Sequence, residues 1–407
     1  MNAIIKITIT IVACSAAISF YAVCCTVLNR DFSDDLTERI RVAHIQRDEK
    51  VDVTEEIRRE QVREVVGDQG LKFHQPDSTD RAVGSFPEEK WERIDPAAAG
   101  WSVSGLELAK DYFERLNADA CMIIQKGYVV VAWGEISKPI EARSLRKSFL
   151  NTLIGIYVDK GTIRLDESLA SIGIDEKTPL TDVEKSATVA QLLESRSGIF
   201  LPSAYDPNDH PQRGLYKPGE IWHYNNWDFN SLGTVFEKKT GKKIFESFDL
   251  EIATQLKMQD FNLKNTKYLF EDVSMHPAYL FETSARDDAR LGLLWLNRGN
   301  WKGKQIVSRA WMDESTALRT DFKGKGGLSL RDGYGFLFWI DKDKKGNVVG
   351  FAALGNSGQY IYVNSKHDLV IVLRADPGSI FKKWLGMRLD PKESYGLVDV
   401  ILDAAPQ

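Results

Sequence analysis

The stretch RSLRKSFLNTLIGIYVDKG, residues 143–161, places a serine and a lysine one helical turn apart at the start of a long apolar pattern. Its apolar residues recur at the spacing of a helix that is buried on one face: Phe149, Leu150, Leu153, Ile154, Tyr157 and Val158. Gly161 is a typical helix stop. The pattern predicts a helix that begins at Ser144 and carries Lys147 in its first turn.

Ser144 and Lys147, at positions i and i+3, lie on one face of such a helix. A serine hydroxyl is a poor nucleophile until a base takes its proton. A lysine that is desolvated against the serine has its pKa lowered enough to help. The free N–H groups and the positive dipole end of the helix start favour an oxyanion nearby. The pair is therefore a candidate nucleophile and proton carrier.

The same S-x-x-K string occurs again as Ser379-Ile-Phe-Lys382, so the string alone decides nothing. The second copy follows a turn, Asp376-Pro377-Gly378, whereas the first precedes a long apolar helix pattern. We interpret Ser379 as a loop residue or a helix cap.

Strand-like runs lie on both sides of this helix in the sequence. CMIIQKGYVVVAWGE, from Cys121, predicts a hairpin about Lys126-Gly127. Strand-like runs return near the C-terminus, and helix-like stretches such as VAQLLESR, WDFNSLGTVFEKKTG and SARDDARLGLLWLNRG lie between. We expect an α/β (α+β) fold, in which distant segments form one antiparallel sheet flanked by helices, with an inserted, mostly helical subdomain.

Two further motifs are candidates for chemistry. Tyr224-Asn225-Asn226 precedes a helical run and offers a phenol for proton relay and an amide for substrate binding. Tyr362-Val363-Asn364 also fits Y-x-N, but it lies in a strand-like run, where a sheet side chain is the simpler interpretation. Gly355-Asn356-Ser357-Gly358 precedes a strand whose edge N–H groups would face a substrate carbonyl, although for this motif taken alone an ordinary β-turn is the better interpretation.

In this order the three motifs resemble those of the serine β-lactamase and penicillin-binding-protein superfamily, S-x-x-K, then Y-x-N, then K-T-G or a relative. The tyrosine form resembles the class C branch and its esterase, D-aminopeptidase and 6-aminohexanoate-dimer hydrolase relatives. Connecting text such as PGEIWHYNN and GNSGQYIYVNSKHDLVIV agrees, and the likeness covers roughly residues 90–402. The resemblance implies a β-lactamase-like fold and a serine hydrolase that forms an acyl-enzyme.

The resemblance also implies residue roles. Ser144 would be the acylated nucleophile, Lys147 would keep its proton mobile, and Tyr224 would be the general base that also protonates the leaving group. Asn226 would contact substrate, as would the third motif through Asn356 and Gly358. The backbone N–H groups of Ser144 and Gln359 would form the oxyanion hole.

One departure from the family pattern concerns substrate. Asn356 stands where β-lactamases carry the lysine of K-T-G, so this position offers no cation to a substrate carboxylate. We therefore expect an esterase or amidase of neutral or small substrates rather than an efficient β-lactamase. The alternatives are a non-hydrolytic penicillin-binding or sensor-type member of the fold and a D-alanyl carboxypeptidase that acts on cell-wall peptides.

The N-terminus predicts a membrane segment. An uncharged run of 22 residues from Ile7 to Leu28 is long enough to span a bilayer and follows Lys6. We expect residues 1–29 to be an anchor or a cleaved signal segment, 30–87 a charged stalk or linker, and 88–407 the hydrolase domain. The predicted location of that domain is extracytoplasmic, in the periplasm or at the cell surface.

Composition excludes several other classes of protein. The 53 basic and 58 acidic residues nearly balance, so no nucleic-acid-binding surface is expected. Four cysteines, three of them in the N-terminal apolar run, and six scattered histidines give no disulfide framework and no metal-ligand spacing. We expect neither a metal nor a cofactor, and a small ester, amide or peptide as the substrate.

Three neighbouring features have simpler structural interpretations. His223 is expected to pack near the cleft rather than to act in catalysis. Ser195-Arg196-Ser197-Gly198 is expected to form a structural turn. For Trp222 and Trp227, core packing and a place in the pocket wall are equally plausible.

Overall fold

The computed structural model describes residues 72–74, 85–206, 209–322, 331–376, 389 and 391–406. The predicted anchor and most of the predicted stalk lie outside these ranges, as does Ser379. Within the described ranges, no helix has the length and apolar character needed to cross a membrane.

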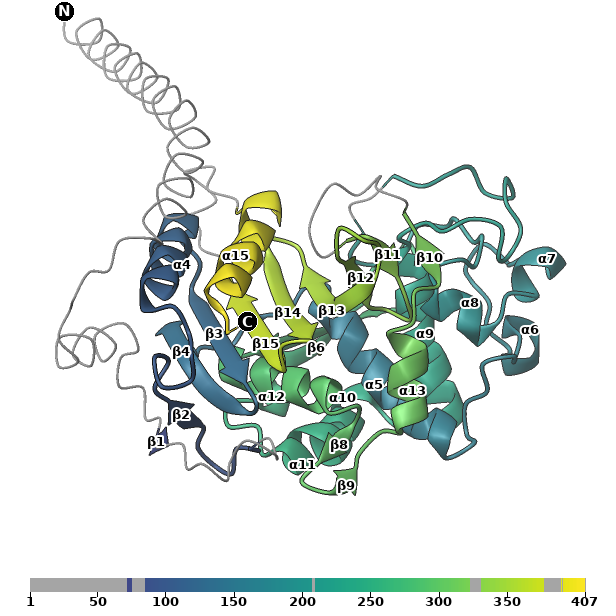
Figure 1. Ribbon diagram of the computed structural model, residues 1–407. Helices are drawn as coiled ribbons and strands as arrows, with labels where there is room; N and C mark the ends of the chain where they lie inside the picture. The colour runs from purple at the N-terminus through teal and green to yellow at the C-terminus, as the bar shows by residue number, and fades with distance from the viewer. Residues whose placement is uncertain are drawn as a thin grey trace, which may run out of the picture. The chain divides into compact units, whose positions relative to one another are not determined.

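A ten-stranded sheet forms the centre of the molecule, in the order β1-β2-β4-β3-β15-β14-β13-β12-β11-β10 (Figure 1). It joins N-terminal to C-terminal segments, because β3 (Ala120–Gln125) pairs antiparallel with β15 (Leu369–Arg374). This confirms the expected sheet of distant segments. One edge departs from the expectation, since β1 (Lys72–His74), β2 (Glu92–Ile94) and β4 (Tyr128–Gly134) pair in parallel.

The predicted hairpin joins β3 to β4 through Lys126 and Gly127, both with positive φ, as a tight two-residue turn requires. The other side of the sheet is a series of antiparallel strands, which confirms the C-terminal strand-like runs. These strands are β10 (Thr320–Asp321), β11 (Gly333–Tyr334), β12 (Trp339–Lys342), β13 (Val348–Gly355) and β14 (Gln359–Asn364).

Alternating side chains of the central strands pack on different helices. Tyr360 of β14 contacts Tyr395 of α15 (Pro391–Ala404), which lies beside α4 (Val103–Leu116) in Figure 1. The next residue, Ile361, packs closely against Gly292 of α12 (Ala285–Leu296) on the other side. Helices therefore cover both faces of the sheet.

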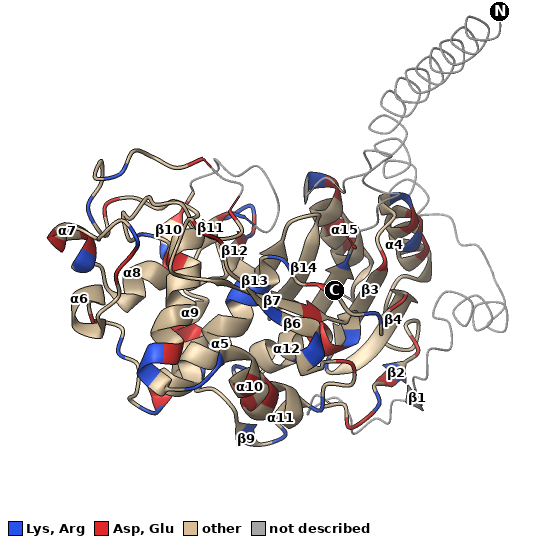
Figure 2. Cartoon of the chain, turned by 180° about the vertical axis from the view of Figure 1, so that it is seen from behind, with Lys and Arg blue, Asp and Glu red and all other residues tan. Residues whose placement is uncertain are grey.

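The remaining elements lie mostly in the predicted helical region between β4 and β10. A three-stranded sheet, β5-β7-β6, and a two-stranded hairpin, β8-β9, accompany its short helices. Both acidic and basic residues lie on the outer helices α4 and α7 (Figure 2). The bounds are β5 (Ile140–Glu141), α6 (Leu169–Ile172), α7 (Asp182–Lys185), α8 (Val189–Leu193), α9 (Asn226–Thr240), α10 (Ile244–Phe248), η2 (Asp249–Ala253), α11 (Thr254–Leu256), η3 (Leu263–Asn265), β6 (Thr266–Leu269), β7 (Ala278–Thr283), β8 (Asn300–Trp301), β9 (Lys304–Gln305) and α13 (Arg309–Ser315).

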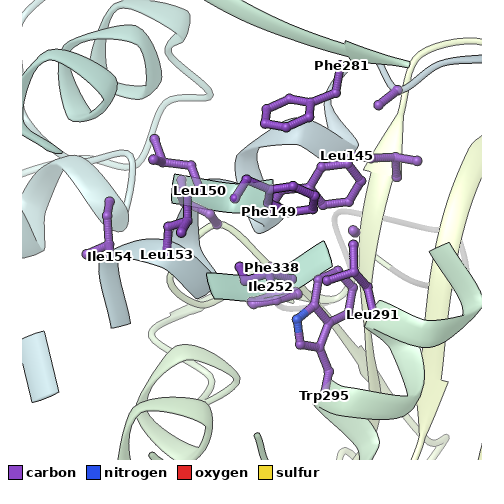
Figure 3. Close-up of a cluster of buried hydrophobic side chains, with 14 of the residues drawn as sticks. Leu145, Phe149, Leu150, Leu153, Ile154, Ile252, Phe281, Leu291, Trp295 and Phe338 are labelled. Atoms are coloured by element: carbon purple, nitrogen blue, oxygen red, sulfur yellow. The ribbon is translucent and has the colours of Figure 1, made fainter. Parts of the chain in front are cut away.

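Helix α5 (Leu145–Asp159) runs through the core, where Phe149, Leu150 and Leu153 meet side chains from distant elements (Figure 3). Its start and end match the prediction, but burial on one face only is wrong, because it is buried on all sides from Leu145 to Tyr157. Two of its polar side chains bond to carbonyls of the neighbouring loop: Ser148 donates to the Leu337 carbonyl at 2.7 Å and Asn151 to that of Phe336 at 2.9 Å. This burial fixes the position of the helix start.

Candidate active site

Ser144 caps the N-terminus of α5, directly after Arg143, whose φ of 51° is unusual for a non-glycine residue. The Ala142 N–H donates to the Phe281 carbonyl of β7 at 2.8 Å and anchors this turn. As the helix cap, Ser144 has a backbone N–H with no partner inside the helix. The first motif thus lies where the sequence predicts it.

Lys147 is buried, with 3% of its surface exposed, and lies between the hydroxyl groups of Ser144 and Tyr224. Its Nζ donates to Ser144 Oγ at 2.9 Å and to the Tyr224 hydroxyl at 2.7 Å. Burial lowers the pKa of Lys147 well below its usual value, and the charge of Arg146 lowers it further, whereas Asp206 opposes the shift. A buried amine of this kind favours its neutral form.

Tyr224 reaches Lys147 from the loop before α9. Ser195 holds that loop, because its Oγ donates to the His223 carbonyl at 2.6 Å and accepts from the Asn225 N–H at 3.1 Å. The Tyr224 ring stacks on Trp339 with centroids 5.6 Å apart. Burial raises the pKa of Tyr224 to about 12, against the opposing effects of a hydrogen bond with Ser144 and of nearby arginines.

The second Y-x-N copy is structural, as expected. The Tyr362 hydroxyl donates to Asp341 at 2.7 Å and accepts from Asn364 at 2.9 Å, all within the sheet. The Ser195–Gly198 segment is likewise a structural turn, since Ser197 donates to the buried Asp228 at 2.5 Å.

The third motif forms the turn between β13 and β14, and its residues face different ways. Gly355 and Asn356 line the cavity described below. Gly358, with φ of 71°, faces α15, because a Cβ there would lie 2.5 Å from Ser394 Oγ. The Gln359 side chain is fully buried and bridges the Glu141 carbonyl and Arg374. The three motifs converge, but the side-chain position of Gly358 points away from substrate.

A cavity of about 740 Å³ opens over Ser144. Sequence reasoning missed most of its wall, which comes from loops without a recognisable motif. The lining residues are Arg143, Ser144, Tyr205, Asp206, Tyr224, Asn226, Glu271, Arg331, Trp339, Leu354, Gly355 and Asn356. Two arginines lie in this wall although the third motif carries no cation: Arg143, which pairs with Glu141 at 3.2 Å, and Arg331.

The structure distinguishes core residues from residues near the cavity among Trp222, His223 and Trp227. Trp227 is fully buried and donates from Nε1 to Glu176 at 2.9 Å, so it belongs to the core. Trp222 packs edge-on against Trp339, behind the cavity wall. His223 packs against Phe200 and lies 3.3 Å from His210, which agrees with a packing role.

Comparisons with known proteins agree with this geometry. A family profile described as Beta-lactamase matches residues 117–375. The 6-aminohexanoate-dimer hydrolase of Paenarthrobacter ureafaciens is 22% identical over 74% of this chain and 86% of its own. The penicillin-binding protein homologue from Pyrococcus abyssi has a TM-score of 0.55 and 18% identity, covering 74% of this chain and 78% of its own.

A beta-lactamase from Mycobacterium bovis has a similar fold, with a TM-score of 0.51 and 20% identity over 74% of this chain and 100% of its own. The profile match spans more than half of the 407 residues and includes Ser144, Lys147, Tyr224 and Gln359. The chain belongs to the beta-lactamase family of serine hydrolases.

Proposed function

We propose that this protein cleaves an ester or amide bond through an acyl-enzyme on Ser144. One observation carries the proposal: Lys147 Nζ lies within hydrogen-bond distance of both Ser144 Oγ, at 2.9 Å, and the Tyr224 hydroxyl, at 2.7 Å. The cluster lies at the wall of the cavity, where a substrate carbonyl has access to it.

The directions of the two pKa shifts favour a neutral amine beside a neutral phenol. In the proposed first step Ser144 Oγ attacks the substrate carbonyl and passes its proton to Lys147 Nζ. Lys147 then returns a proton through the Tyr224 hydroxyl to the leaving-group atom. This assigns the resting base to Lys147 and keeps for Tyr224 the role of proton donor to the leaving group.

The second half of the reaction reverses these transfers. Water attacks the acyl-enzyme carbonyl, gives its proton to the lysine–tyrosine pair and releases the acid, and Ser144 recovers its proton. The N–H groups of Ser144 and Gln359 are the proposed oxyanion donors, supported by their positions at the start of α5 and of β14.

Arg331 supports one second candidate, hydrolysis of an amide that carries a carboxylate. Its Nη2 donates to the Tyr395 hydroxyl at 2.9 Å and its guanidinium stacks on Trp339 at 4.6 Å, while its buried Nε has no partner among the described residues. None of the ion pairs formed by those residues includes Arg331. The D-alanyl carboxypeptidase alternative and an amide like that named for the Paenarthrobacter relative both fit such a cation.

A fluorophosphonate probe, followed by turnover of a substrate panel, tests the proposal. The panel contains p-nitrophenyl acyl esters, nitrocefin, linear amides with and without a terminal carboxylate, and D-alanyl peptides. We expect labelling and ester turnover in the wild type and in Ser379→Ala, and neither in Ser144→Ala. Labelling without any turnover would instead indicate a sensor, and rapid nitrocefin turnover without ester cleavage would contradict the substrate preference.

We also propose that residues 7–28 hold the enzyme at a membrane with its catalytic domain extracytoplasmic. The uncharged run and the charged segment after it support this. Fractionation of cells that express the full chain, with and without residues 1–29, tests it. Recovery of the full chain in the soluble cytoplasmic fraction would contradict it.

A further inference from the structure

The Asn226 side chain lies at the cavity wall in one defined orientation. Its Nδ2 donates to Asp206 Oδ1 at 3.0 Å. Its Oδ1 is buried and accepts no hydrogen bond from any residue that the structure describes. Both residues line the catalytic cavity.

The chemistry of Asp206 dictates this orientation. An ionised carboxylate only accepts hydrogen bonds, so the neighbouring amide must turn its NH₂ group toward it. Asn and Gln orientations are assigned from their hydrogen-bond networks, and here the network allows one assignment. The amide oxygen of Asn226 must consequently point away from Asp206.

Asp206 is itself held in place. His210 Nε2 lies 2.8 Å from Asp206 Oδ2, and the Ser203 hydroxyl donates to the same oxygen at 3.1 Å. His223 Nε2 lies 3.3 Å from His210 Nδ1, so the two rings extend the network that begins at Asp206. Burial, chiefly, lowers the pKa of His223, which favours its neutral form.

We propose that Asp206 is a positioning residue that makes Asn226 a hydrogen-bond acceptor for substrate. The cavity then selects substrates that carry an N–H or O–H donor near the scissile bond, such as N-acylated amino acid derivatives, over those with an ether or ester oxygen at that position. This inference rests on the proposed hydrolysis at Ser144 and names the substrate class of that site.

The size of the expected substrate preference follows from the free-energy cost of leaving a buried acceptor unpaired. Asn226 Oδ1 is already withdrawn from water, so a substrate with the donor satisfies it and a substrate without the donor leaves it unpaired, which is the situation in which sites discriminate strongly. We expect a preference of about 10-fold or more in kcat/KM for the donor-bearing substrate.

The test uses matched pairs of p-nitrophenyl esters. One member carries an acylamino N–H in its acyl chain and the other an oxygen in place of that N–H, at one, three and five methylenes from the carbonyl. The ratio of kcat/KM within a pair cancels differences in folding or in active fraction, so a merely structural effect of a substitution does not move it.

Asp206→Asn is the decisive variant, because an asparagine at this position both donates and accepts and lets the Asn226 amide group rotate by 180°. For the pair of esters that the wild type distinguishes best, we expect the ratio of kcat/KM in Asp206→Asn to fall to within about 3-fold of one. Glu271→Gln is the matched control: it removes one negative charge from the same cavity wall, and Asn226 donates to Asp206 and not to Glu271, so the ratio should persist.

The Ser144→Ala protein separates this inference from the proposed function. Isothermal titration of the same pairs into Ser144→Ala and into Ser144→Ala/Asp206→Asn gives the preference as a ratio of Kd values without turnover. If the wild type cleaved none of these esters, the proposed hydrolysis would be contradicted. The ratio of Kd values would still show whether the site prefers ligands with the N–H donor. Ratios near one in every wild-type pair, or a preference that Asp206→Asn leaves unchanged, would overturn the inference.

Discussion

Lys147 Nζ and the Tyr224 hydroxyl lie 2.7 Å apart in a buried site, where the pKa of the lysine is lowered and that of the tyrosine is raised. Both shifts arise mainly from burial, which disfavours the charged form of each group. The proposed mechanism needs these two groups in their neutral forms, an amine lone pair to receive the Ser144 proton and a hydroxyl proton to pass on. The central chemical claim depends on this arrangement.

The acid limb of the pH–rate profile should respond to two charges near Lys147 in opposite directions. Arg146 lowers the pKa of Lys147 and Asp206 raises it. Because activity requires the neutral amine, Arg146→Gln should move the limb of kcat/KM to higher pH and Asp206→Asn should move it to lower pH. Shifts in the same direction, measured with one p-nitrophenyl ester, would count against Lys147 as the base.

Tyr224→Phe should lower kcat by about 10²- to 10⁴-fold, the usual contribution of a positioned proton donor. The phenyl ring retains the stacking on Trp339, so the melting temperature should stay close to that of the wild type. The loss should be larger for amides than for p-nitrophenyl esters, because an amine leaving group must be protonated. Equal losses for both substrates would argue against proton donation by Tyr224.

Lys147→Met should abolish turnover and yet stabilise the fold. Because the folded chain has the lower pKa, lysine burial lowers stability most at pH values below that folded pKa, and the penalty shrinks as the pH rises and vanishes above the usual value near 10.5. A thioether of similar length removes this penalty, by on the order of 1 kcal/mol. Denaturant unfolding at pH 7 checks the sign, and a matched Lys110→Met on the partly exposed face of α4 should change little.

Arg331→Gln should weaken binding of carboxylate-bearing amides, with KM rising about 10-fold, and leave neutral esters less affected. Since the Arg331 charge also lowers the pKa of Tyr224, the same substitution should raise that pKa. A parallel assay of an amide with and without its terminal carboxylate measures the difference. If both KM values rise equally, Arg331 does not recognise the carboxylate.

Arg374 connects Gln359 of β14 to the core. It is fully buried, pairs with Asp288, and donates to Gln359 Oε1 at 2.8 Å and to the Ile140 carbonyl at 2.6 Å. Arg374→Met leaves the Asp288 charge buried and unpaired, so it should cost about 3–5 kcal/mol. The double variant with Asp288→Leu should recover part of this loss in chemical denaturation, whereas an additive loss would show that the pair is not coupled.

Local sequence patterns predicted the elements whose formation depends on interactions between residues close together in the sequence. The start of α5 directly after Ser144, the Lys126-Gly127 turn and the C-terminal strands follow from side-chain period and turn chemistry, and the structure has them there. The burial of α5 on all sides could not be predicted, because Ser148, Asn151 and Thr152 read as a polar face until their buried partners are known.

The substrate-facing wall of the site was also beyond prediction. Tyr205, Asp206, Glu271 and Arg331 come from loops of no recognisable pattern, and only the tertiary fold brings them to Ser144. The missing lysine of the third motif predicted a preference for neutral or small substrates, because a motif reports only the charge at its own position. Arg331, 25 residues before Asn356, adds a guanidinium group to the cavity wall.

Intact-mass and peptide-level mass spectrometry of the enzyme, acid-quenched during turnover of a p-nitrophenyl ester, tests the central claim most directly. The account predicts one acyl adduct on the peptide that contains Ser144. The adduct should be absent from Ser144→Ala and present in Ser379→Ala. Steady ester turnover with no adduct on Ser144, or an adduct on another residue that Ser144→Ala leaves unchanged, would contradict it.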